Sequence, residues 1–335
     1  MPFAFARLVS LRIQNSTRES GSVMSRSDET PHRTLAIIGA GRVARGLGAR
    51  LREAGWRIAA VAARHLPAAR AAVRSIGAGI PCAVLSRRVF DAPIILLAIP
   101  DDALAAVASQ LAERGGADLR RKIILHTSGA LSSAVLAPLA RHSAWTGVIH
   151  PMQSFAARSR PRLDGVLFGI EGHPQALRVI RRMVRSVGGE AVRIEPGRKV
   201  EYHCAGTFAA AHVLASVEAG VRLLAAAGMK RREATRALLR LARQVLDNQE
   251  VHGPRAAWTG PLSRRDLATI RLHWDALGRY PDEFRQAYSA MTRLAARLLA
   301  DAPDALLEQV DSSLAAASAP EPPREARAAA AASAE

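Results

Sequence analysis

Three short motifs with acidic, hydroxyl or imidazole side chains each follow a run of apolar residues. The motifs are Asp101-Asp102 after residues 94–99, His126-Thr127-Ser128 after residues 122–125, and His150-Pro151 after residues 146–149. If these runs are strands of one parallel sheet, the motifs meet at its carboxyl edge, where α/β proteins bind ligands. A neutral imidazole can exchange a proton near pH 7. The pattern therefore indicates proton transfer beside a bound ligand.

Each of these side chains also has a structural interpretation. Asp101 and Asp102 are more typical of a helix N-cap than of catalysis, and Ser128 could cap its own turn. A lone histidine is more often a satisfied core residue, but two at the ligand edge keep both interpretations open for His126 and His150.

The segment TLAIIGAGRVARGLGARL contains a GxGxxA pattern between an apolar run and a helical one. Gly39 permits the tight turn after the strand, Gly41 lets the backbone approach a pyrophosphate, and Ala44 allows close helix–strand packing. The helix N-terminus then favours the phosphates. We expect a dinucleotide site formed by residues Gly39, Ala40, Gly41, Arg42, Val43, Ala44, Ile99 and Pro100.

The second predicted strand, residues 57–63, is followed by Arg64, where NAD enzymes usually carry an acid for the ribose hydroxyl. Arg64 could instead pair with a 2′-phosphate. The sequence thus favours NADP over NAD, although Arg64 could also be one more of many surface arginines.

The elements that must position these residues alternate as short apolar strands and helices up to about residue 194. This pattern predicts an α/β Rossmann fold, a doubly wound parallel sheet covered on both faces. After Pro196 only helical periodicity is found, which predicts an all-helical C-terminal domain. We expect a disordered extension at 1–31, an NADP-binding domain at 32–197, a helical substrate and dimerisation domain at 198–316, and a disordered tail at 317–335.

The helical domain adds further candidates. Lys199, Tyr202 and His203 lie on the first turns of its long first helix, and Lys199 and His203 are candidate catalytic residues. Lysine is scarce in this arginine-rich chain, which hints at a group that must release a proton, although a chance surface lysine remains an alternative. Asn248, Thr259 and Arg264 are candidate substrate contacts, with Arg264 as a clamp for a carboxylate.

The composition argues against a nucleic-acid-binding, disulfide-rich, metal-binding or membrane protein. The formal net charge is +18, but aromatic residues make up 4% of the chain and are not interleaved with the arginines, so solvated helix faces explain the charge better than nucleic-acid binding. Two cysteines cannot form a disulfide framework or a multi-cysteine metal site, and they fit a reducing cytoplasm. The most apolar stretch, residues 205–229, carries charges that favour a buried helix over a membrane span. We expect neither a metal site, a membrane partner nor a nucleic-acid partner.

Residues 36–277 resemble a bacterial family that pairs a Rossmann-like domain with a helical C-terminal domain of unknown function. Its members are often described as deazaflavin-dependent NADP oxidoreductase-like. The matching segments are IIGAGRVARGLG, LLAIPDDAL, HTSGAL, GVIHPMQSF, KVEYHCAG and AWTGPLSRRDLATIRLHWDAL. The chain departs from the family in having Arg265 where glycine is usual and Ala210-Ala211 where Ser-Asn is common.

The layout is more distantly similar to prephenate dehydrogenase and the 6-phosphogluconate dehydrogenase superfamily. That resemblance implies His150 as proton acceptor, Ser128 as its hydrogen-bonding companion, and a homodimer formed through long helices. We expect an NADP(H)-dependent oxidoreductase that acts on a small, anionic carbonyl or imine compound. The two departures keep open an alternative, a non-catalytic NADP-binding sensor or scaffold.

Overall fold

The computed structural model describes residues 33–156 and 161–318. The chain divides after Thr207 into two compact units, an α/β unit and a helical unit. The division lies ten residues beyond the predicted boundary, because the first turns of the long helix pack with the α/β unit. The predicted extension at 1–31, and all but two residues of the predicted tail at 317–335, lie outside the described residues.

The first unit is built on an eight-stranded sheet with the order β3-β2-β1-β4-β5-β6-β7-β8. The strands are β1 (Thr34–Ile38), β2 (Arg57–Ala62), β3 (Ile80–Cys82), β4 (Ile94–Leu97), β5 (Ile123–His126), β6 (Trp145–Pro151), β7 (Leu167–Gly172) and β8 (Glu190–Arg193). Neighbouring strands are parallel except β6 and β7, which are antiparallel. The sheet is thus parallel-dominated, which confirms the predicted α/β Rossmann fold, and the one antiparallel pair was not predicted.

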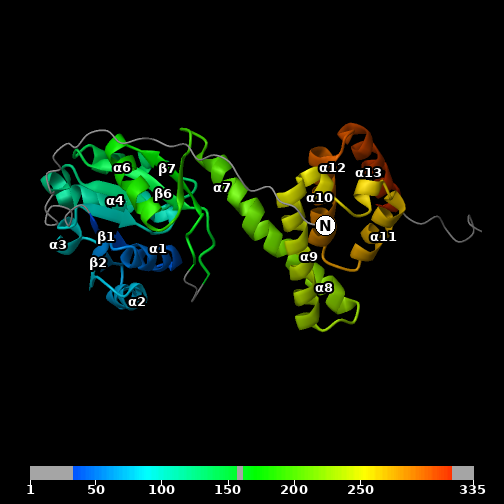
Figure 1. Ribbon diagram of the computed structural model, residues 1–335, viewed down its shortest axis with the longest axis horizontal. Helices are drawn as coiled ribbons and strands as arrows, with labels where there is room; N and C mark the ends of the chain where they lie inside the picture. The colour runs from blue at the N-terminus through cyan, green and yellow to red at the C-terminus, as the bar shows by residue number, and fades with distance from the viewer. Residues whose placement is uncertain (1–32, 157–160, 319–335) are drawn as a thin grey trace, which may run out of the picture. The chain divides into compact units, whose positions relative to one another are not determined.

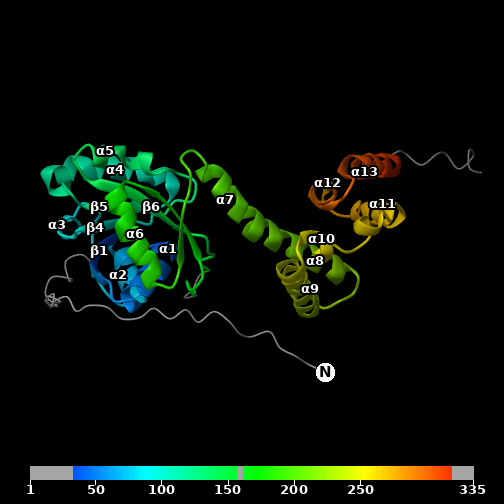
Figure 2. The same ribbon diagram turned by 45° about the horizontal axis from the view of Figure 1, so that its top comes forward.

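The apolar strands form because both faces of the sheet are covered by helices. Leu35 and Ile37 of β1 point into one core layer, and Ala36 and Ile38 point into the other. The first layer is closed by α1 (Arg42–Glu53), α2 (Leu66–Ile76) and α6 (Pro174–Ser186), and the second by α3 (Arg87–Phe90), α4 (Asp101–Gly115) and α5 (Ala137–Ala140). Figure 1 shows α1 and α2 below the strands, and Figure 2 shows α4 and α5 above them.

The strand order reverses at β1, which lies between β2 and β4. Chain connections therefore leave β1 and β4 toward different sides, and a crevice opens beyond their carboxyl ends. The predicted glycine turn follows β1, and residues Ile99 and Pro100 follow β4. The topology thus places the predicted cofactor residues at the usual ligand position of such sheets.

The helix that leaves the sheet begins as α7 (Lys199–Thr207), has a π-helical turn at Phe208–His212, and continues as α8 (Val213–Ala226). The second unit continues with α9 (Arg231–His252), α10 (Pro254–Ala257), α11 (Leu267–Leu277), α12 (Asp282–Leu299) and α13 (Pro303–Ser318), which are labelled in Figure 2. Helix α13 was not predicted, although Leu306, Val310 and Leu314 recur at four-residue spacing and pack into the small core of this unit.

The stretch predicted as a buried helix, residues 205–229, is far more exposed than predicted. The span Lys199–Ala226 is long and apolar enough to cross a membrane by length and composition, and 6% of its most apolar window is buried in the chain. The interpretation of this stretch as a buried helix was therefore wrong for the single chain. Glu218 in its centre is paired with Arg231 and Arg222.

The segment with the altered family motif forms the start of α11. Arg265 adopts a left-handed conformation with φ of 58°, which favours glycine, the residue that the family resemblance leads us to expect at this position. Asp266 follows as the N-cap and accepts hydrogen bonds from the backbone nitrogen and the hydroxyl of Thr269. Arg265 therefore places strain on the turn before α11, while the cap that Asp266 forms on this helix is intact.

Candidate active site

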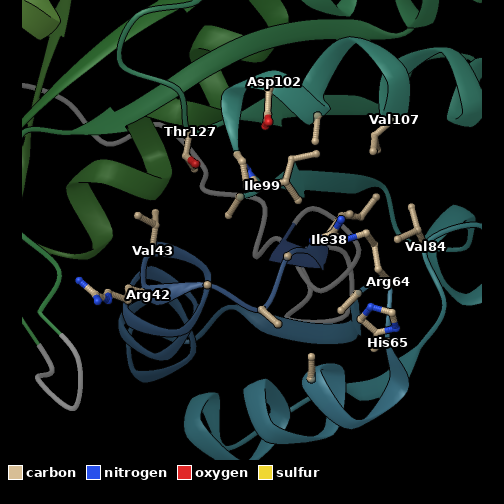
Figure 3. A pocket seen from close by; sticks show the side chains of 18 residues that line it. Ile38, Arg42, Val43, Arg64, His65, Val84, Ile99, Asp102, Val107 and Thr127 are labelled. Carbon is tan, nitrogen blue, oxygen red and sulfur yellow. The ribbon is translucent and has the colours of Figure 1, made fainter.

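A cavity of about 700 Å³ lies beyond the carboxyl ends of β1 and β4, a size typical of small-molecule sites. All of the predicted cofactor residues except Ala44 line it, namely Gly39, Ala40, Gly41, Arg42, Val43, Arg64, Ile99 and Pro100. Figure 3 shows Arg42 and Val43 at one end, Arg64 and His65 at the other, and Ile99 between them. The predicted cofactor residues thus lie at both ends and in the middle of one cavity.

The glycine turn between β1 and α1 is shaped for close backbone approach. Gly39 has φ of 133°, and a Cβ there would overlap the carbonyl oxygen of Ala98. At Gly41 a Cβ would meet nothing within 4 Å, so the space above the first turn of α1 is open. Ala44 does not reach this space, because it is fully buried in the core. Its inclusion among the cofactor contacts was wrong, whereas its expected role in packing is confirmed.

At the other end of the cavity, the side chains of Arg64 and His65 are exposed at the end of β2. Neither residue has an acidic partner among the described residues. This end of the cavity therefore presents a cation and an imidazole, groups that suit a phosphate better than a ribose hydroxyl.

Next to the cavity, Ser128 and Asp101 form a hydrogen-bonded pair. The hydroxyl of Ser128 donates to the carboxylate of Asp101 at 2.7 Å and accepts from the backbone nitrogens of Ala130 and Leu131. No hydrogen bond joins Ser128 to His150 among the described residues, so the prediction that they are companions was wrong. Asp101 lies in the first turn of α4 without capping it, which also corrects its expected structural role.

Lys199 of α7 is 2% exposed, so its interpretation as a chance surface lysine was wrong. Its ammonium donates to the carbonyl oxygen of Ser128 at 2.9 Å and lies 5.6 Å from the ring centroid of Tyr202. Burial lowers the pKa of Lys199 to about 8, although the carboxylates of Glu171 and Asp101 oppose the shift. A lysine in this state can exchange a proton close to neutral pH.

His150 lies inside strand β6, which runs one residue past it, rather than beyond the strand as predicted. Its Nδ1 is 2.9 Å from the hydroxyl of Tyr202, and its ring is 5.8 Å from that of His203. Burial, together with the charge of Lys199, lowers the pKa of His150 to about 4. The imidazole is therefore neutral at physiological pH.

His126 is the last residue of β5 and is 0% exposed. Its Nδ1 accepts from the backbone nitrogen of Ser128, and its Nε2 lies 3.1 Å from the carbonyl oxygen of Ser132. Both ring nitrogens are thus used inside the protein, and burial lowers the pKa to about 4. The prediction of His126 as a substrate contact was wrong, because it is a core histidine that shapes the Ser128 turn.

The remaining candidates are distributed between the two units. His203 is exposed on α7 beside His150 in the first unit. Thr259 and Arg264 are exposed in the second unit, and Asn248 is half-buried there, with its side chain accepting a hydrogen bond from Gln244. The role of these three residues as substrate contacts stays a prediction.

Sequence reasoning assigned no binding or catalytic role to several residues that line or support the site. Thr127 and Asp102 line the cavity, and Glu171 accepts hydrogen bonds from the backbone and hydroxyl of Ser133. The sequence analysis did not predict a functional role for Tyr202, although its spacing of three residues from Lys199 places both side chains on one helix face. That spacing was the available signal for a second functional residue on α7.

Two family models match the chain. Residues 21–151 match a Rossmann-like domain, and residues 166–295 match a domain of unknown function named DUF2520. The chain pairs a Rossmann-like domain with a DUF2520 domain. The DUF2520 match begins before β7, so it includes the last strands of the sheet as well as α7 to α11 and most of α12. A search among curated proteins finds no match.

Several solved structures share this architecture. A protein from Bacteroides fragilis, described provisionally as an NADP oxidoreductase, is 20% identical with a TM-score of 0.66 and covers 78% of this chain and 96% of its own. An imine reductase from Pseudomonas sp. is 17% identical, with a TM-score of 0.60 and coverage of 83% and 99%. A pyrroline carboxylate reductase from Plasmodium falciparum, solved with NADP bound, is 12% identical, with a TM-score of 0.51 and coverage of 85% and 99%. At these identities the similarity shows the fold.

Proposed function

We propose that the protein is an NADP(H)-dependent oxidoreductase. The observation that carries the proposal is that the cofactor cavity and the buried Lys199 are connected through two consecutive residues of the first unit. The cavity that the predicted cofactor residues line also includes Thr127, and the next residue, Ser128, accepts a hydrogen bond from the buried ammonium of Lys199 through its carbonyl oxygen. A cofactor cavity that adjoins proton-exchanging groups is the arrangement that hydride transfer requires.

The residues of the cavity fit NADP(H). The open space at Gly41 and the N-terminus of α1 suit a pyrophosphate, and Arg64 at the other end suits a 2′-phosphate. When bound, the nicotinamide would supply or accept the hydride. The first turn of α1 has no acidic residue that would repel the phosphates.

His150 transfers the proton that accompanies hydride transfer, and Lys199 stabilises the charge that develops on the substrate. In the oxidation direction the neutral imidazole of His150 accepts the proton of the substrate, and in the reduction direction it returns the proton. The ammonium of Lys199 stabilises negative charge that develops on the substrate oxygen or nitrogen. Asp101 and Ser128 hold the turn that positions this ammonium.

The substrate we propose is a small, anionic carbonyl or imine compound. The cation of Lys199 favours an anion at the site, and structural relatives include proteins named as imine reductases and pyrroline carboxylate reductases. The alternative, an NADP-binding sensor without turnover, keeps the same cofactor site. Hydride transfer to a substrate separates the two.

Cofactor choice is tested at Arg64. We expect the wild-type protein to bind NADPH at least tenfold more tightly than NADH, which corresponds to about 1.4 kcal/mol. Arg64→Asp should erase or reverse this preference, because a carboxylate repels the 2′-phosphate and suits the ribose hydroxyl. Calorimetric titration with both cofactors measures the effect, and Arg70→Asp on the outer face of α2 serves as the control. Equal affinities in the wild-type protein would contradict the assignment.

We also propose that the protein is a homodimer formed through α8 and α9. Leu214 on α8 and Leu241 on α9 are 69% and 59% exposed, more than a stable monomer usually leaves on adjacent helices. We expect a native mass of twice 35.7 kDa by light scattering. Leu214→Glu combined with Leu241→Glu should shift the mass to that of a monomer, whereas Leu66→Glu on α2 should not. A monomeric wild-type protein would rule out the dimer.

A further inference from the structure

The hydroxyl oxygen of Tyr202 lies among three hydrogen-bonding groups, two of which belong to His150. It is 2.9 Å from Nδ1 of His150, 3.2 Å from the carbonyl oxygen of His150, and 3.2 Å from the backbone nitrogen of Gly169. The tyrosine ring stands edge-on to the imidazole, with an interplanar angle of 85°. One hydroxyl group thus contacts both the backbone and the side chain of the same histidine.

The donors and acceptors in this group determine where the imidazole proton lies. A phenol has one hydrogen to donate and two lone pairs to accept with. The backbone N–H of Gly169 can only donate to Tyr202, and the carbonyl oxygen of His150 can only accept from it. The phenolic hydrogen is then used by the carbonyl, so Nδ1 must donate its own hydrogen to the phenol. All three contacts are made together only when His150 carries its proton on Nδ1.

Two glycines allow this arrangement. A Cβ at Gly169 would lie 2.6 Å from the ring of Tyr202, and a Cβ at Gly129 would lie 2.8 Å from Nε2 of His150. The tyrosine therefore packs directly on β7, and the far side of the imidazole packs directly on the Ser128 turn. Nε2 receives no hydrogen bond from a described residue, so its lone pair is unused by this part of the protein.

The environment keeps both rings neutral. Burial raises the pKa of Tyr202, which excludes a phenolate at physiological pH. The pKa of His150 is about 4, lowered first by burial and then by the positive charge of Lys199. Because the phenol and the imidazole are both neutral, only the position of the imidazole proton, on Nδ1 or on Nε2, is left to be determined.

We propose that Tyr202 is a positioning residue that holds His150 in the Nδ1–H tautomer and leaves the Nε2 lone pair free. The tautomer follows from the contacts alone, and its use by a substrate rests on the proposed function. In that reaction the free lone pair is the atom that accepts the proton of the substrate in the oxidation direction. The Nε2–H tautomer would present a donor there instead.

Nitrogen-15 NMR of the full-length labelled protein at pH 7 distinguishes the tautomers, because a protonated and an unprotonated ring nitrogen resonate far apart. We expect a protonated Nδ1 and an unprotonated Nε2 for His150, identified by the loss of its signals in His150→Asn. Tyr202→Phe should move a measurable fraction of His150 to the Nε2–H form, since Nδ1–H loses its acceptor. An unchanged thermal midpoint checks that this variant is folded.

The chain offers a matched control in a second histidine–tyrosine pair. Nδ1 of His273 is 2.9 Å from the hydroxyl of Tyr288 in the helical unit. Tyr288→Phe should alter only the signals of His273 and leave those of His150 unchanged. An Nε2–H tautomer in the wild-type protein, or a His150 tautomer unchanged in Tyr202→Phe, would overturn the proposal.

The NMR result and the turnover of His150→Ala test the tautomer proposal and the proposed function separately. If His150 shows the Nδ1–H form but His150→Ala retains full turnover, the tautomer assignment stands and the proton-transfer role fails. If His150 shows the Nε2–H form and His150→Ala is inactive, the role stands and Tyr202 does not set the tautomer.

Discussion

Replacement of His150 by alanine is expected to lower turnover by about 100- to 10,000-fold, the usual loss when a positioned general base is removed. Affinity for NADPH should change little, because the phosphates are held by the glycine turn and the N-terminus of α1. Steady-state turnover and calorimetric titration with NADPH measure the two quantities separately. His150 contacts Tyr202 and His203 but does not line the cofactor cavity, which is why the two effects should separate.

His142→Ala is the matched control for this variant. His142 is exposed after α5, and its side chain makes no hydrogen bond to a described residue, so the substitution should leave turnover unchanged. Full activity of His150→Ala, together with loss of activity in a Lys199 variant, would assign the proton transfer to Lys199.

Lys199→Met is expected to lower turnover by about 100- to 1,000-fold, as found when one preorganised donor is removed from an active site. It should also change the pH profile. Lys199 is protonated below its pKa of about 8 and neutral above it, so wild-type turnover in the reduction direction should fall as the pH rises past 8. The residual activity of Lys199→Met should lack this alkaline limb. The pKa of His150 should rise in the variant, because the charge of Lys199 helps to lower it.

Lys122→Met provides a second lysine in a similar setting. Its ammonium also donates to a backbone carbonyl, that of Ala92, and burial lowers its pKa. Lys122 precedes β5 and therefore lies at the opposite edge of the sheet from the candidate site. An alkaline limb that persists in Lys199→Met but disappears in Lys122→Met would contradict the role of Lys199.

The structure changes the pH dependence that the sequence suggests. An imidazole with an ordinary pKa predicts a limb near neutrality. The pKa of His150 is instead about 4, because burial and nearby positive charge disfavour the imidazolium. The limb that belongs to His150 is therefore expected near pH 4, and the limb nearest to neutrality belongs to Lys199.

Local sequence signals predicted the Rossmann part of the fold well. The glycine pattern predicts a turn, a helix start and a phosphate site together, because a side chain at Gly39 would overlap the carbonyl of Ala98, whereas the space beside Gly41 is open for a ligand. Similarly, strand order is constrained by the alternation of strands and helices. The antiparallel β7 was missed because nothing in its own residues reveals which neighbour it pairs with.

The candidate site was harder to predict because its contacts are long-range. The sequence brought Ser128, His150 and Lys199 together, but it paired Ser128 with His150 rather than with Asp101. The observed pairs, Ser128 with Asp101 and His150 with Tyr202, join residues 27 and 52 positions apart. They depend on the residue at which each strand ends, which local sequence patterns do not define. His126 illustrates the same limit, since its burial follows from the turn that folds over it.

The exposed helix face was misread for a different physical reason. An apolar helix in the sequence implies burial, but it does not say whether the covering surface comes from the same chain. Leu214 and Leu241 remain exposed in the single chain, so the same pattern that predicted a buried helix now supports the homodimer.

The central proposal, hydride transfer by an NADP(H)-dependent enzyme, is tested most directly with NADPH that carries deuterium on the transferred position. The wild-type protein is incubated with this cofactor and with a panel of carbonyl, imine and deazaflavin compounds, supplemented by a small-molecule cell extract. Mass spectrometry then follows the label. We expect deuterium to appear in a reduced product, and to fail to appear with His150→Ala at equal NADPH occupancy. Tight binding of NADPH with all of the label retained on the cofactor would contradict the proposal and identify the protein as a sensor.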